Sequence, residues 1–163
     1  MNDREEFYTV RGYELRQAHN QISSSMEDYL EMAYRLSQEK GYTRVNDLAR
    51  ALNVQPPSAS RMVQKLADAK LMNYEKYGVI ELTDNGKEIG KYLLKRHATI
   101  EEFLKIIGVT DGILEETEKI EHHLSPQTID QIYILVQFLK VNTTVLNDLH
   151  TFQQKAGGNL EKT

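Results

Sequence analysis

The chain is 163 residues long, which is enough for one large domain or two small ones with a buried apolar core. It has no apolar run of membrane-spanning length and its start does not resemble a signal peptide, so a cytoplasmic protein without a membrane partner is expected. The absence of cysteine excludes disulfides and thiolate metal sites. The net charge is −4, but basic residues outnumber acidic ones between Gly41 and Lys105, which is compatible with a local phosphate-binding face.

Residues 1–22 have no clear hydrophobic period and are expected to form an N-terminal extension. A helix is predicted to follow up to about Gln38, because Ser24 or Ser25 can cap its start and Glu27 completes a capping box. Its predicted buried stripe consists of Met26, Tyr29, Ala33 and Leu36.

Two carboxylates, Asp28 and Glu31, lie three residues apart on the side of this helix that is opposite the stripe. Asp28 is explained equally by the favourable interaction of a negative charge with a helix N-terminus. The more specific interpretation is that both carboxylates face a second body of the protein.

Two short helices are predicted at 43–52 and 56–70, joined by a tight turn at Asn53–Gln55. The second helix has an apolar side and a polar side. The polar side and its flanks offer Pro57, Ser58, Ser60, Arg61, Gln64 and Lys65. This is typical of a helix-turn-helix, in which Arg and Gln read base edges while Lys and Ser hold phosphates. The alternative is a solvated helix face in an ordinary bundle.

Residues 71–83 alternate in part between apolar and polar and are predicted to form a hairpin that turns at Tyr77 and Gly78. Lys76 and Tyr77 would then lie at its tip, where they could meet the DNA backbone. A hairpin directly after a recognition helix is a wing. The N-terminal half is therefore predicted to be a winged helix.

A long helix is predicted from Thr83 or Asp84 to Ile107. Its nearly heptad apolar seam, suited to bridging two domains or pairing with a second subunit, consists of Ile89, Leu93, Ile100, Leu104 and Ile107. His97 lies on this seam. A lone histidine there is explained by an interface contact, but the other ligand-type residues of the chain favour a role in metal binding.

The helix predicted at 111–123 contains the densest group of ligand-type residues. Glu118, Glu121 and His122 stand at i, i+3 and i+4, so their side chains share one face. Carboxylates with imidazole suit divalent manganese, iron or zinc. A solvated acidic helix end with a capping histidine is the alternative.

The rest of the chain is predicted to be helical. A helix beginning at Ser125–Pro126 has a core stripe formed by Ile129, Ile132, Leu135, Val136 and Leu139. A short last helix runs from about Asn142 to Lys155, and residues 156–163 are expected to fray.

Six segments in this order resemble the diphtheria-toxin-repressor family, and within it the manganese-sensing branch, the manganese transport regulators. They are Ser25–Glu31, Gly41–Ala49, Pro57–Leu66, Leu82–Thr83, Arg96–His97 and Ile120–Ser125. The resemblance covers about residues 23–150. It implies a mainly α protein, with a winged helix-turn-helix domain and its small β-hairpin wing at 23–90 and an all-helical dimerisation domain at 91–155. It also implies a homodimer that binds an operator in double-stranded DNA when metal is bound.

The resemblance further implies six metal ligands, namely Asp28, Glu31, His97, Glu118, Glu121 and His122. Their four carboxylates with two neutral histidines match the charge of two divalent ions, so two Mn²⁺ per subunit are expected, with other divalent metals possible. Asp28 separates the two branches, because the iron-sensing branch typically has methionine there. The expected function is a Mn²⁺-sensing transcriptional regulator, a repressor of manganese uptake genes, and not an enzyme.

Two other functions fit parts of the sequence. A di-metal carboxylate enzyme in a helical bundle uses paired carboxylates and histidines, but its Glu-x-x-His motif is missing because Glu118 is followed by Glu121 and then His122. A winged-helix regulator that senses a small organic ligand would make the acidic residues incidental.

Overall fold

The structure is a computed structural model that describes residues 22–160, so nearly all of the expected N-terminal extension lies outside the described residues. The chain divides into two compact units between Lys95 and Arg96. This division falls inside the long helix α5 (Asp84–Ile106), which also contains the boundary expected near residue 90. Within the described part, none of the helices is long and apolar enough to cross a membrane.

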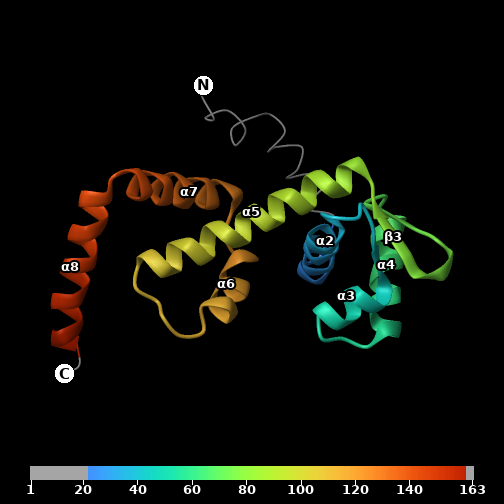
Figure 1. The fold of residues 1–163 in the computed structure, drawn as a ribbon, viewed down its shortest axis with the longest axis horizontal. Helices are drawn as coiled ribbons and strands as arrows, with labels where there is room; N and C mark the ends of the chain where they lie inside the picture. Colours follow the sequence, from blue (N-terminus) through green and yellow to red (C-terminus); the bar gives the residue numbers. More distant parts are fainter. Residues whose placement is uncertain (1–21, 161–163) are drawn as a thin grey trace. The chain divides into compact units, whose positions relative to one another are not determined.

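The N-terminal unit is a winged helix, as predicted (Figure 1). Its elements before α5 are α2 (Ser24–Ser37), β1 (Thr43–Arg44), α3 (Val45–Ala51), α4 (Pro56–Asp68), β2 (Met72–Tyr74) and β3 (Val79–Leu82). Helices α3 and α4 form the helix-turn-helix, and β2 and β3 form the wing around a 3-10 turn at Lys76–Gly78. The sheet is antiparallel in the order β1-β3-β2.

Two predictions at the edges of these elements were wrong. Residues 43–44 are not the start of a helix, because Thr43 pairs with Ile80 and adds a third strand to the predicted two-stranded hairpin. The N-cap of α2 is Ser23, whose hydroxyl accepts a hydrogen bond from the Met26 amide at 3.3 Å. The strand depends on pairing with the distant β3, whereas the cap is a local hydrogen bond for which three adjacent serines compete.

One continuous apolar core holds the N-terminal unit together. Its most deeply buried side chains are Leu30, Leu48, Val63, Leu66, Met72, Ile80, Ile89 and Leu93. Leu30 takes a central place in α2 that the predicted stripe had left out, while Leu36 is 37% exposed. The start of α5 belongs to this core because Gly90 allows close approach: a Cβ there would lie 2.7 Å from the Tyr34 side chain.

The C-terminal unit contains the second half of α5 followed by α6 (Ile113–Glu121), α7 (Pro126–Val141) and α8 (Thr143–Leu160). Its buried apolar residues form two separate clusters. One consists of Ile100, Leu104 and Ile129, and the other of Ile106, Val136 and Leu139. Helix α8 runs on past the end that was predicted near Lys155.

The predicted apolar stripes of α5 and α7 were each wrong at one position. Ile107 was expected on the seam of α5, but it lies beyond the last helical residue and is 44% exposed, whereas Ile106 is buried with Val136 and Leu139 of α7. Leu135 is also exposed, together with other large apolar side chains of α7 and α8. These are Ile134, Leu135, Phe138, Val141, Val145 and Phe152.

Candidate functional site

The packing of α5 against α6 places a group of ligand-type side chains together in the C-terminal unit. On α5, His97 shares a face with Ile100 and Leu104, three and seven residues further on. Those two residues pack with Ile113 and Ile120 of α6. Glu118 and Glu121 stand three residues apart on α6, so their carboxylates share one face, and both lie near His97.

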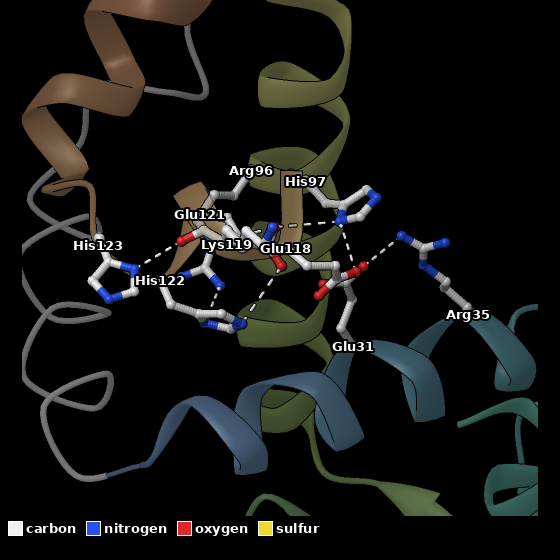
Figure 2. Close-up of polar contacts among 9 residues, drawn as sticks. All are labelled: Glu31, Arg35, Arg96, His97, Glu118, Lys119, Glu121, His122 and His123. Carbon is white, nitrogen blue, oxygen red and sulfur yellow. Dashed lines mark hydrogen bonds and ion pairs between the residues drawn. The ribbon is translucent and has the colours of Figure 1, made fainter. Parts of the chain in front are cut away.

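We call His97, Glu118, Glu121 and His122 the acid–histidine cluster. His97 Nδ1 lies 3.6 Å from Glu118 Oε1 and 3.3 Å from Glu121 Oε2. His122 Nε2 lies 3.8 Å from Glu121 Oε1 (Figure 2). One ligand atom each of Glu118, Glu121 and His122 lies within 4.8 Å of the others. Four of the six sequence-predicted ligands are therefore brought together by this unit alone.

The cluster has the chemistry of a cation site. Glu121 is 1% exposed, and its Oε2 accepts no hydrogen bond from any residue that the structure describes, although His97 and Arg96 lie at ion-pair distance. A buried carboxylate oxygen without a hydrogen bond is costly unless a positive charge compensates it. Glu121 and His122 also stand at the C-terminus of α6, where the helix dipole favours a cation. Carboxylate oxygens and imidazole nitrogens fit a divalent first-row metal.

The neighbouring histidine has a different role. His123 Nδ1 lies 2.7 Å from the carbonyl oxygen of Lys119, so the imidazole closes the end of α6 instead of joining the cluster. Lys119 itself pairs with Glu115 and Glu116 on the solvent side of α6. The hydrogen bond between Lys119 and Glu115 lowers the pKa of the Glu115 carboxyl and raises the pKa of the Lys119 ammonium. Glu115 and Glu116 thus have a basic partner of their own, so these two carboxylates are not candidate ligands.

Arg96 also belongs to this site, although it was not among the residues predicted from the sequence. The Arg96 side chain is 3% exposed, its Nε lies 3.9 Å from Glu121 Oε2, and its Nη2 lies 3.4 Å from His122 Nδ1. The position directly before a candidate ligand was the available signal. An arginine within a seam of apolar residues indicates a functional role as much as a histidine at such a position does.

The remaining two predicted ligands, Asp28 and Glu31, belong to α2 of the N-terminal unit. Burial raises the pKa of the Tyr29 phenol, and the negative charge of Asp28 raises it further. Glu31 forms an ion pair with Arg35 on the next turn of the helix. Asp28 and Glu31 stand three residues apart within α2.

The candidate DNA interface is the outer side of α4. Pro57, Ser58, Arg61, Gln64 and Lys65 are exposed there, and Ser60 is half-buried. The opposite side of α4 packs into the core through Ala59, Val63 and Leu66. Gln64 Nε2 donates a hydrogen bond to Asp68 at 3.0 Å, which orients its amide. The side chains expected to reach DNA thus share one accessible surface.

The turn of the wing presents the Tyr77 side chain to solvent. Lys76 opens the turn, and Tyr77 follows with a φ of 68° and a side chain that is 92% exposed. Arg44 Nη1 donates a hydrogen bond to the Tyr77 carbonyl at 3.5 Å. Arg44, on the edge strand β1, is a contact to the wing that the sequence analysis did not identify, since residues 43–44 had been expected in a helix.

Two family models match most of the chain. The iron dependent repressor N-terminal DNA binding domain matches residues 21–80, and the iron dependent repressor metal binding and dimerisation domain matches residues 83–147. The chain is 49% identical over 132 residues to the HTH-type transcriptional regulator MntR of Shouchella clausii, covering 80% of this chain and 92% of that one. It is also 49% identical over 132 residues to MntR of Bacillus subtilis, covering 80% of this chain and 93% of that one.

Solved structures show the same fold. The manganese regulator SloR aligns with a TM-score of 0.61 at 30% identity, over 69% of this chain and 54% of the SloR chain. The present chain thus spans about half the length of that relative, in contrast to its nearly full-length match with the MntR proteins. The relatives named as transcriptional regulators argue against the di-metal enzyme as the function of this cluster.

Proposed function

Because the chain belongs to the iron-dependent repressor family, and is thereby a metal-dependent DNA-binding transcriptional regulator that acts as a dimer, we propose that its activating ion is Mn²⁺. The proposal extends to repression of manganese uptake genes, for which the similarity to the manganese regulator SloR is the support, and to a cytoplasmic location. The observation that carries it is the acid–histidine cluster. Its hard oxygen donors with imidazole suit a divalent ion of the manganese type, and it lacks any sulfur ligand.

We propose that His97, Glu118, Glu121 and His122 hold the metal together with Asp28 and Glu31 from α2. The first four are supported by their mutual distances. The last two are supported by the family resemblance and by their spacing on one helix. The four carboxylates carry four negative charges, which two Mn²⁺ ions per subunit would balance. The metal supplies the positive charge that this set of side chains lacks.

This ligand set gives a mechanism for switching. Without metal, carboxylates that belong to two different units of the chain repel one another. With metal, ligands from α2 and from the α5–α6 pair share the same ions. This restricts the orientations that the two recognition helices of a dimer can adopt. A two-fold dimer needs those helices about 34 Å apart to enter successive major grooves. Metal and DNA then strengthen each other's binding reciprocally.

The dimer contact is proposed to lie on α7 and α8. Six large apolar side chains of these helices, including Phe138 and Val141, are exposed in the single chain. Exposed apolar surface of this kind marks a protein interface. The family model for this region, which includes dimerisation in its description, supports the same placement.

The DNA contacts are proposed to come from α4 and the wing. Arg61 and Gln64 read base edges, while Pro57, Ser58, Ser60 and Lys65 position the helix, and Lys76 and Tyr77 meet the backbone next to it. The exposure of Arg61, Gln64 and Lys65 on α4 and of Tyr77 at the wing turn supports these roles. Arginine and glutamine are the residue types that form paired hydrogen bonds with guanine and adenine.

The deciding experiment measures DNA affinity in chelator and in excess Mn²⁺, using the promoter region upstream of the chain's own gene and a random duplex of equal length. We expect Mn²⁺ to tighten binding to the promoter by about tenfold or more, within the usual range of allosteric coupling. Equal affinity in the two conditions would refute metal activation and favour a regulator that senses an organic ligand.

The choice of manganese is tested at Asp28. Its carboxylate is a hard, charged ligand, whereas the thioether of methionine is soft and neutral. Asp28→Met is expected to raise the DNA-binding response to Fe²⁺ or Co²⁺ relative to Mn²⁺, measured across a metal series without oxygen. An unchanged metal ranking would show that Asp28 is only a favourable charge at the helix start.

A further inference from the structure

Arg96 lies next to two of the proposed metal ligands. It is buried between α5 and α6, with its guanidinium 3.4 Å from His122 Nδ1 and 3.9 Å from Glu121 Oε2 (Figure 2). Both partners are proposed metal ligands. The guanidinium is thus the resident positive charge of the acid–histidine cluster within the C-terminal unit.

The contact with His122 has only one chemically sensible form. A guanidinium is always protonated and offers donors but no acceptor, so Arg96 Nη2 donates and His122 Nδ1 accepts. A neutral imidazole that accepts at Nδ1 carries its proton at Nε2. Neither ring nitrogen of His122 then presents a free lone pair to an ion.

Metal binding by His122 therefore requires that Arg96 withdraws from it. If Nδ1 binds the ion, the guanidinium must leave that lone pair. If Nε2 binds the ion, the ring proton moves to Nδ1, where it would face another donor. In both cases two positive charges, the ion and the guanidinium, would also compete for the same Glu121 carboxylate.

We propose that Arg96 is an internal competitor of the metal, which holds His122 and Glu121 in the metal-free protein and sets the metal concentration at which the regulator switches. This inference rests on the proposed metal site and adds a residue that is not one of its ligands. A residue that merely supports a metal site strengthens metal binding, and its loss lowers the metal affinity about 10–100-fold. The loss of a competitor such as Arg96 should instead raise the metal affinity. The two roles therefore predict opposite changes in Mn²⁺ affinity when Arg96 is replaced.

The first experiment measures Mn²⁺ affinity by competition with a fluorescent chelator for four full-length proteins. They are the wild type, Arg96→Gln, Arg96→Lys and, as a control, Lys105→Gln. Lys105 lies on the same helix and forms an exposed pair with Glu101, outside the cluster. Circular dichroism of each metal-free protein checks the fold.

We expect Arg96→Gln to bind Mn²⁺ about tenfold more tightly than the wild type, because one competing positive charge is gone. Arg96→Lys keeps the charge, so its affinity should stay within about threefold of the wild type, as should that of Lys105→Gln. Weaker or unchanged binding in folded Arg96→Gln overturns the proposal. If the wild type does not bind Mn²⁺ at all, the proposed function fails instead, and the two failures are distinguishable.

A second experiment needs no variant of Arg96. In ¹⁵N-labelled, metal-free wild-type protein, histidine nitrogen chemical shifts report which ring nitrogen carries the proton. We expect His122 to be protonated at Nε2 and to accept at Nδ1. Protonation at Nδ1 alone would be incompatible with donation from Arg96 and would overturn the proposal, even if Arg96→Gln failed to fold.

Discussion

The two units of this chain bury their residues in different ways. The N-terminal unit has one continuous apolar core that includes all its helices and its sheet. The C-terminal unit divides its buried apolar residues between two small clusters and also buries Arg96, His97 and Glu121. The first unit is stabilised by its own apolar side chains, whereas the second leaves a cluster of charges and an exposed apolar face, for which we propose a metal ion and a second subunit as partners.

The largest effect, on the free energy of unfolding, should come from shortening one fully buried side chain in each unit. Leu66 and Ile129 are both fully buried, the first in the continuous core and the second in a small cluster. We expect Leu66→Ala to cost about 4–5 kcal/mol and Ile129→Ala about 2–3 kcal/mol, because a small cluster can relax around the lost atoms. Hydrogen exchange of peptides from α4 and α7 in the metal-free protein measures both. Equal costs would show that the C-terminal core is as rigid as the N-terminal one.

The second effect concerns the charges that the C-terminal unit buries. Glu121→Gln removes the carboxylate that both histidines of the acid–histidine cluster approach. We expect the Mn²⁺ affinity to fall about 100-fold or more, at least as much as the loss of a supporting contact around a metal site. Glu116→Gln, an exposed change on the same helix, is the control and should leave the affinity unchanged. Similar behaviour of the two variants would exclude Glu121 as a ligand.

The sequence predicted the N-terminal unit well because its signals are local. Turn residues, proline at the start of α4 and the apolar period define the helix-turn-helix, and the turn at Tyr77 and Gly78 defines the wing. Its errors were a strand, β1, that depends on pairing with β3, and the identity of one cap. Neither pairing nor the choice among three adjacent serines is encoded in the pattern of a single segment.

The sequence predicted less of the C-terminal unit because its organisation depends on contacts between helices and with partners. The spacing of Glu118, Glu121 and His122 indicated a shared face, and the structure brings His97 to it. Arg96 was missed, since a buried arginine is recognised only from what surrounds it. Leu135 was wrongly assigned to the core because an exposed apolar side chain can follow the same sequence pattern as a buried one.

A third prediction compares the two DNA-contacting elements of the N-terminal unit. Arg61→Ala should lower the discrimination between operator and random DNA by about 1–3 kcal/mol, because it removes a contact to a base. Lys76→Ala on the wing should weaken both kinds of binding alike and flatten the dependence on salt, because it removes a phosphate contact. Binding of each variant to both duplexes at several salt concentrations distinguishes the two roles. If Arg61→Ala behaved like Lys76→Ala, the base reader would lie elsewhere.

The smallest predicted effect is the loss of stability when the N-cap serine of one helix in each unit is replaced. The hydroxyl of Ser23 accepts from the Met26 amide at 3.3 Å, and the hydroxyl of Ser125 accepts from the Thr128 amide at 3.2 Å. Replacing either serine by alanine should cost about 1 kcal/mol. The matched control is Ser24→Ala, which changes the next residue of α2 and should cost almost nothing.

The two cap substitutions should differ in how many helices lose hydrogen-exchange protection. In a unit with one continuous core, Ser23→Ala should lower hydrogen-exchange protection equally in α2, α3 and α4, because these helices unfold together. In a unit with divided clusters, Ser125→Ala should lower protection at the start of α7 more than in α8. Uniform loss of protection across the C-terminal unit would show that its two small clusters act as one core, and the contrast between the units would then lie only in their charges.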